Sequence, residues 1–79
     1  MTSLILCRNY KTAWLVAERY TLRRPDWFYV VGYRTIMGYG RGTRVYVYDV
    51  PGCPLTTPQM EMRAAMEKLG FDIVNVESL

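Results

Sequence analysis

Histidine is absent from this sequence of 79 residues, and cysteine occurs only twice. Without histidine, chemistry that depends on an imidazole base is excluded. Two thiols are too few for a disulfide-stapled scaffold or for a Cys/His zinc site within one chain. We therefore expect a protein that is not an enzyme, with no catalytic residues, no metal site and no cofactor.

Long apolar runs are missing too. The longest dense apolar stretch, residues 27–33, is far shorter than the ~20 residues that a membrane-spanning helix needs. Residues 1–7 have no basic start and are too short for a secretory signal. We expect a cytoplasmic protein that does not bind membranes, in which Cys7 and Cys53 are reduced and Cys7 is a buried structural residue.

The apolar material that is present suffices for one small core. Hydrophobic residues make up 51% of the chain, which is too much for an intrinsically disordered protein. A chain of this length forms one domain. Residues 1–79 are therefore predicted to be a single domain.

Clusters of apolar and β-branched residues predict four strands, at residues 3–7, 27–31, 44–50 and 71–76. The glycine-rich stretch 32–42 is predicted to be a loop with room for one helical turn at residues 34–37.

Two main helices are expected between these strands. The first follows Asn9, a good N-cap, and ends near residue 20. Its apolar side is predicted to be buried and consists of Tyr10, Ala13, Trp14, Val16, Ala17 and Tyr20, whereas Leu15 falls among polar residues and is expected to be exposed. The second helix begins near Thr56 and ends before Gly70, which suits the position after a C-cap.

The predicted order, β-α-β-β-α-β, fits two folds. One is a small three-layer α/β domain with a mostly parallel four-stranded sheet, and the other is a ferredoxin-like α+β domain in which the second and third strands form a hairpin. The connector at residues 32–42 is long for a tight hairpin. The first two strands are apolar on both faces, as buried parallel strands are. The pattern favours the parallel sheet.

The first strand, LILC, leads into a helix that opens with Lys11-Thr12, and the third strand, VYVYD, ends in Asp49. This arrangement resembles the core of the P-loop NTPases, and the resemblance implies a nucleotide site at Lys11, Thr12 and Asp49. The chain departs from the family because the glycines of the phosphate-binding loop are missing. Residues 8–10 are too few to form its cradle of backbone N–H groups. We interpret the pattern as a nucleotide-binding remnant that does not hydrolyse ATP.

The segments LILCRNYK (residues 4–11) and WFYV (residues 27–30), together with Gly70-Phe71, also resemble small accessory proteins of actinobacterial phages. This resemblance implies a non-catalytic protein that binds a host or phage protein and that in some cases impairs growth of the host.

Charge is distributed unevenly along the chain. Residues 1–48 contain eight basic and two acidic residues, whereas residues 49–79 contain two basic and five acidic residues. A basic surface is suited to an acidic partner. The predicted protein-binding surface is the polar side of the first helix with the basic connector after it: Lys11, Leu15, Glu18, Arg19, Arg23 and Arg24. A homodimer is a second way for so small a chain to bury apolar surface.

Residues 41–48, RGTRVYVY, begin like the RNA-recognition motif R-G-F-G-F-V-x-F but differ from it at the intermediate positions. Alternation places Tyr46 and Tyr48 on one side of their strand, where an open sheet would let them stack on bases. Under a parallel fold they pack beneath a helix instead. The alternative nucleic-acid site consists of Arg34, Arg41, Arg44, Tyr46 and Tyr48.

Overall fold

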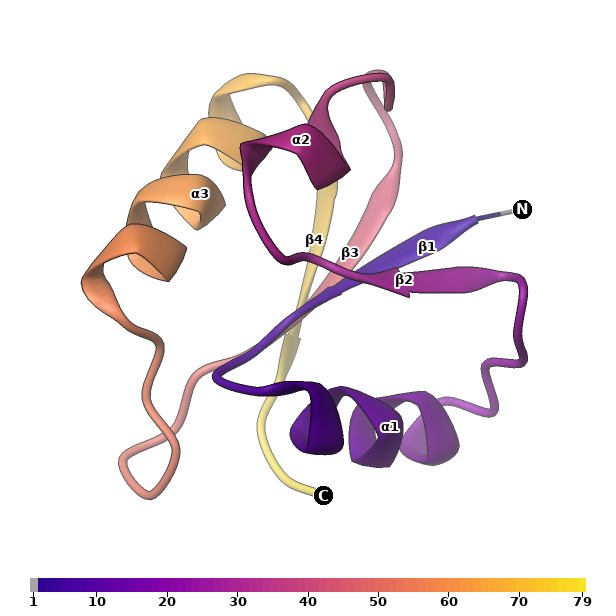
Figure 1. The fold of residues 1–79 in the computed structure, drawn as a ribbon, viewed down its shortest axis with the longest axis vertical. Coiled ribbons are helices and arrows are strands. Elements are labelled where there is room, and N and C mark those ends of the chain that lie inside the picture. The colour runs from indigo at the N-terminus through magenta and orange to yellow at the C-terminus, as the bar shows by residue number, and fades with distance from the viewer. Residues whose placement is uncertain (1) are drawn as a thin grey trace.

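Four parallel strands form one sheet in the computed structural model, which describes residues 2–79 (Figure 1). The elements are β1 (Ser3–Leu6), α1 (Tyr10–Arg19), β2 (Trp27–Tyr29), α2 (Tyr33–Ile36), β3 (Arg44–Tyr48), α3 (Thr57–Lys68) and β4 (Asp72–Val76). Their order across the sheet is β2-β1-β3-β4. The predicted parallel α/β fold is confirmed. The hairpin alternative is wrong because β3 pairs with β1 and not with β2.

The segment between β2 and β3 is a crossover with a helix of its own. This helix, α2, begins one residue before the expected turn at residues 34–37. Its last residue, Ile36, is 4% exposed and anchors the crossover in the core. The chain therefore runs β-α-β-α-β-α-β, with one more element than the sequence pattern predicted.

Strands β1, β2 and β3 end earlier than expected, whereas β4 ends at Val76 as expected and begins one residue later. β2 stops at Tyr29, where its pairing with Ile5 of β1 ends. β3 stops at Tyr48, and the chain then forms a tight turn in which Val50 makes an isolated bridge with Cys53. Pairing with a neighbour, and not apolar character alone, thus decides where each strand ends.

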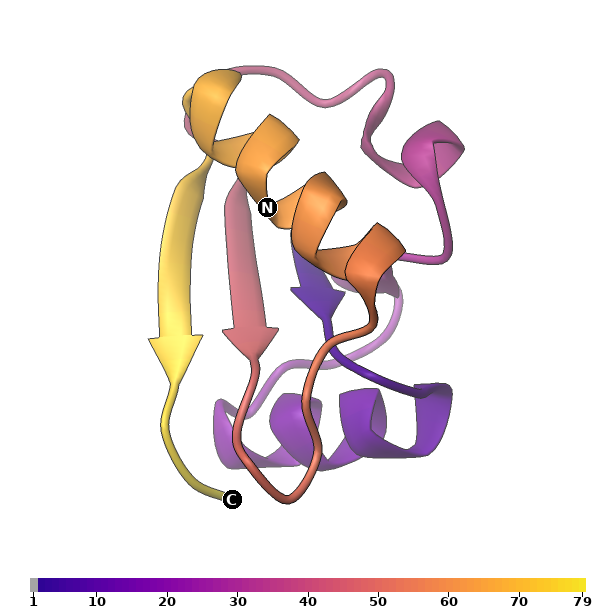
Figure 2. The same ribbon diagram turned by 90° about the vertical axis from the view of Figure 1, so that its left-hand side faces the viewer.

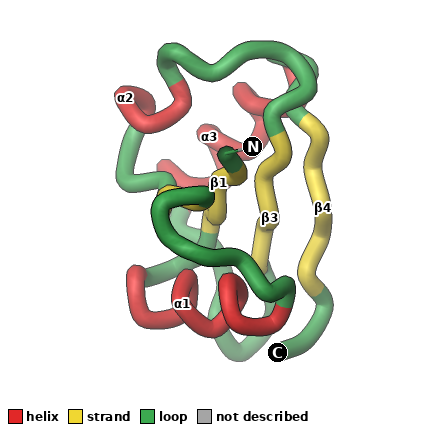
Figure 3. Tube along the Cα trace, turned by 90° about the vertical axis from the view of Figure 1, so that its right-hand side faces the viewer, coloured by secondary structure: helices red, strands yellow, loops and turns green. Residues whose placement is uncertain are grey.

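Helices cover both faces of the sheet, which makes three layers. Figure 1 shows α1 on one side of the strands and α2 and α3 on the other, and Figure 2 shows α3 crossing in front of β1, β3 and β4. In Figure 3, β4 forms one edge of the sheet and lies beside β3. The opposite edge of the sheet is β2, the shortest strand.

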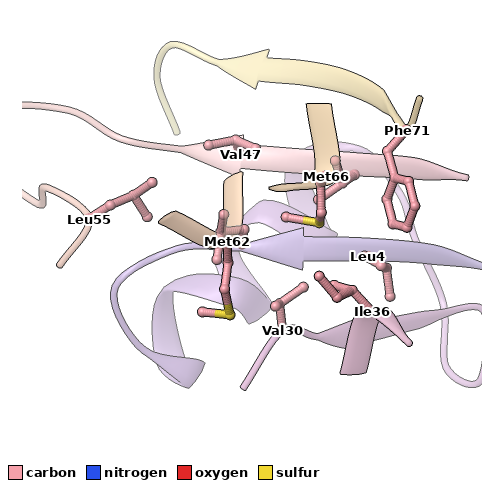
Figure 4. Close-up of a cluster of buried hydrophobic side chains, with 10 residues drawn as sticks. Leu4, Val30, Ile36, Val47, Leu55, Met62, Met66 and Phe71 are labelled. Atoms are coloured by element: carbon pink, nitrogen blue, oxygen red, sulfur yellow. The ribbon is translucent and has the colours of Figure 1, made fainter. Parts of the chain in front are cut away.

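The α3 side of the sheet holds a closed cluster of aliphatic and methionine side chains (Figure 4). Met62 and Met66 of α3 are 4% and 0% exposed and point at the sheet. Strands β1 and β3 supply alternate residues to this cluster, which comprises Leu4, Leu6, Val30, Ile36, Val45, Val47, Leu55, Met62, Met66 and Phe71.

The α1 side is built differently. Small or branched residues of α1, namely Ala13, Val16 and Ala17, are its only buried ones. They allow α1 to approach the sheet, where they pack with aromatic residues on the same side. The buried cluster comprises Ile5, Cys7, Ala13, Val16, Ala17, Trp27, Tyr46 and Val76. The burial expected for Cys7 is confirmed.

Capping residues fix the start of both long helices, as predicted. The Asn9 side chain accepts the backbone N–H of Thr12 at 2.8 Å. Thr56 and Gln59 form a reciprocal capping box at the start of α3.

Both helices end in the same hydrogen-bond pattern. After α1, the N–H groups of Thr21 and Leu22 donate to the carbonyls of Glu18 and Ala17 at 3.2 and 2.8 Å. After α3, Gly70 and Phe71 repeat the pattern at 3.1 and 3.0 Å. The residue in the left-handed conformation is Gly70 in one case (φ +82°) and Thr21 in the other (φ +56°).

Candidate protein-binding face

The outer side of α1 and the adjoining edge strand β2 expose a group of large apolar side chains. Tyr10, Trp14 and Leu15 of α1 are 47%, 44% and 47% exposed, and Phe28 of β2 is 40% exposed. The exposure of Leu15 was predicted, whereas the burial expected for Tyr10 and Trp14 is wrong, because both side chains are exposed. The sheet ends at β2, so no further strand lies beyond it to cover these rings.

The aromatic rings of this region contact one another. Trp14 meets Trp27 edge to face at 5.0 Å between ring centroids, and Tyr10 meets Trp14 at 6.1 Å and Tyr29 at 5.7 Å. Trp27 is fully buried beneath them. Its indole N–H has no hydrogen-bond partner within residues 2–79, so ring contacts are what hold it. Edge-to-face pairs of this kind stabilise a fixed arrangement of the rings.

Arg24, from the connector after α1, lies over these rings. Its guanidinium carbon is 4.1 Å from the ring centroid of Trp27 and 5.5 Å from that of Trp14. It lies 5.9 Å from the rings of both Tyr10 and Phe28. One guanidinium nitrogen donates a hydrogen bond to the Tyr10 hydroxyl at 2.7 Å. We call Tyr10, Trp14, Leu15, Arg24 and Phe28 the α1–β2 face.

The remaining residues of the predicted protein-binding surface lie around this face. Lys11, Glu18 and Arg19 are exposed on α1, and Arg23 is exposed in the connector. The exposure expected for these residues agrees with the structure, and their role in binding stays a prediction. Sequence reasoning missed Tyr10, Trp14 and Phe28, which turn a charged helix surface into an aromatic one. The spacing of Tyr10 and Trp14, four residues apart next to Leu15, was the available signal.

The structure does not bring the alternative nucleic-acid residues together as a stacking surface. Tyr46 is 6% exposed and packs under α1 against Tyr20, with ring centroids 4.6 Å apart, so its face is not open to a base. Tyr48 packs against the same cluster. Arg34 belongs to α2, on the other side of the sheet (Figure 1).

The other two arginines of that alternative have local roles. Arg44 forms an ion pair with Asp72 of β4 at 3.1 Å. Interactions with the Tyr46 side chain and with the Asp72 carboxylate raise the pKa of Arg44. Arg41 is exposed and lies so close to Gly70 that a Cβ there would meet its Cγ at 2.8 Å.

The candidate nucleotide residues follow the carboxyl ends of β1 and β3, where Thr12 and Asp49 are already engaged in hydrogen bonds within the chain. The Thr12 hydroxyl donates to the Asn9 side chain at 2.9 Å. One Asp49 carboxylate oxygen accepts the Leu55 N–H at 3.1 Å. Lys11 is exposed. No pocket opens at this edge or elsewhere in the part of the chain that the structure describes.

The same edge holds both cysteines. The Cys7 thiol donates to the Asn9 carbonyl at 3.2 Å, and burial raises the pKa of Cys7 from 9.0 to about 11. A thiol with that pKa is protonated at neutral pH and is a poor nucleophile. Between residues 2 and 79, no three His, Cys, Asp or Glu side chains are grouped as metal ligands would be.

The fold defines a small doubly wound parallel α/β domain. Neither the protein-family models nor the curated proteins nor the solved structures give a match to this chain. Of the helices formed by residues 2–79, none combines the length and apolar character that a membrane span requires. The functional inference therefore depends on the geometry of the α1–β2 face.

Proposed function

We propose that this domain is a non-catalytic binding module that recognises a protein partner through the α1–β2 face. The observation that carries the proposal is the half-exposed aromatic cluster with Arg24 over it. Tyrosine, tryptophan and arginine are the residue types that dominate binding energy at protein interfaces. Here they come from three consecutive segments of the chain and contact one another.

The rings are also held in place before any partner arrives. Edge-to-face contacts and the Arg24–Tyr10 hydrogen bond restrict their movement. Binding then costs less side-chain entropy than it would with free side chains, which favours affinity. The resemblance to phage accessory proteins makes a host or phage protein the proposed partner.

Capture of partners from host cells tests this function when two matched variants are compared. Leu15→Asp places a charge within the α1–β2 face, and Met60→Asp places one at a residue of α3 that is equally exposed, 49% against 47%. We expect nuclease-treated extracts to yield one dominant protein with the wild type and with Met60→Asp, and not with Leu15→Asp. Equal capture by both variants, or recovery of nuclease-sensitive material alone, would contradict the proposal.

A further inference from the structure

Arg24 has N–H donors that are available to a ligand. A guanidinium has five N–H donors in a fixed fork, and the Tyr10 hydroxyl is the acceptor for one nitrogen of Arg24. Within residues 2–79, no carboxylate lies within ion-pair distance of Arg24. Its position over four aromatic rings fixes the plane of the group while the residue stays exposed. The donors that remain face no anion of this chain.

The charges around Arg24 favour an acidic ligand. Arg23 precedes it in the connector, and Arg19, whose guanidinium carbon lies 5.6 Å from the Tyr20 ring centroid, ends α1, and both are exposed. The nearest acids in the sequence, Glu18 and Asp26, form no ion pair with any of these arginines. An exposed group of unpaired basic residues beside apolar rings complements a surface that carries both a carboxylate and an apolar side chain.

We propose that the α1–β2 face binds an acidic segment of its protein partner. A Glu or Asp carboxylate accepts two N–H groups of Arg24, and a neighbouring apolar side chain packs on the exposed ring of Trp14. Arginine and carboxylate form paired hydrogen bonds that are about twice as strong as neutral ones. This inference rests on the proposed function and adds to it the chemistry of the partner.

The chain carries its own reporter for this contact. Its two tryptophans, Trp14 and Trp27, both lie in the aromatic cluster under Arg24. The probes are two pools of short synthetic peptides with the same apolar positions, one with a central Glu and the other with Gln. Tryptophan fluorescence is followed as each pool is added to the full chain.

We expect a saturable change with the Glu pool at a concentration about tenfold or more below that needed with the Gln pool, because a paired carboxylate is worth more than an amide. Arg24→Gln removes the difference between the pools, and Arg24→Lys retains part of it, since charge remains but the fork is lost. Arg34→Gln, on the far side of the sheet, leaves the difference unchanged. Thermal unfolding of each variant verifies that it is folded.

Equal response to the two pools, no saturable response to either, or an unchanged preference in Arg24→Gln would overturn the acidic-segment inference. So would a mixed-sequence oligonucleotide that changes the fluorescence more strongly than the Glu pool, since that would assign Arg24 to phosphate. The proposed function fails separately, when Leu15→Asp and Met60→Asp capture partners equally. If the captured partner is lost with Leu15→Asp but is still captured by Arg24→Gln, the proposed function stands and the acidic-segment inference is wrong.

Discussion

The two faces of the sheet are packed with different materials. Under α3, aliphatic, methionine and phenylalanine side chains form the buried cluster, with Tyr39 and Ile73 partly buried against it. Under α1, aromatic rings fill the space, and the cluster continues outward into rings that are about half exposed. Burial stabilises in proportion to the apolar area removed from water. The two faces therefore differ in the type of side chain that fills them, with aliphatic residues and methionine under α3 and aromatic rings beside the cluster under α1.

The difference originates in the two helices. In α3, the long side chains of Met62 and Met66 pack against the sheet. The inner side of α1 consists of two alanines and a valine, and its bulky residues, Tyr10 and Trp14, project toward the edge. A helix with a small inner side can lie close to a sheet and still present large side chains at its border.

The largest effect on stability is expected from truncating a side chain that is buried under α3. Met66→Ala removes a fully buried side chain, and such truncations lower the free energy of unfolding by about 2–5 kcal/mol. Met60→Ala, on the exposed side of the same helix, is the matched control and should change it by less than about 0.5 kcal/mol. Urea unfolding measures both. Similar losses in the two variants would show that α3 does not pack as described.

Substitutions just after α1 and just after α3 should change the free energy of unfolding by a smaller amount, with opposite signs for the two helices. Thr21→Gly should raise the free energy of unfolding by about 1 kcal/mol, because a β-branched residue is strained at positive φ. Gly70→Ala should lower it by at least about 1 kcal/mol, since it adds both that strain and a clash with Arg41. Thermal unfolding detects such changes as shifts of roughly 4–8 °C per kcal/mol. A stabilising Gly70→Ala would contradict this description of the α3 end.

An effect limited to alkaline pH is expected from Cys7, on the α1 face. Its pKa is raised by burial from 9.0 to about 11 in the folded chain. Between these values the folded chain keeps a proton that the unfolded chain releases, so stability is complete below pH 9 and falls as pH rises through 11. Cys7→Ala should show a shallower decline in urea unfolding over this interval, whereas Cys53→Ala should decline like the wild type. Identical slopes for wild type and Cys7→Ala would count against the burial of this thiol.

The smallest effect on stability is expected at the centre of the proposed binding surface. Leu15→Asp alters an exposed side chain of α1 and should change the free energy of unfolding by less than about 0.5 kcal/mol. Chemical denaturation measures this, and the same variant is expected to lose its partner. A large loss of stability would mean that Leu15 belongs to the core and would remove it as a test of binding.

The sequence predicted the parallel sheet, both long helices and their caps because these depend on local chemistry. Apolar character on both faces identified buried strands, Asn9 is a strong N-cap, and Gly70 suits the end of a helix. The predicted protein-binding surface on the first helix and its connector was also read from local features, namely charge and the exposed position of Leu15.

The rest depends on which strand lies at the edge and which face each helix covers. Trp14 has a core residue's position on the helical wheel, and its exposure follows from the sheet ending at β2. Alternation alone left Tyr46 either open to a ligand or under a helix, and the parallel fold decides for burial, because α1 lies over it. The stacking of Arg24 on Trp27 joins a connector to a strand, and no local pattern specifies that contact.

The separation of the two faces is tested most directly by amide hydrogen exchange of the chain, alone and in complex with the protein that it captures. We predict that the partner slows exchange in α1, in the connector that carries Arg24 and in β2, and leaves α3 unchanged. Protection centred on α3 or α2, with α1 and β2 exchanging as in the free chain, would contradict the account.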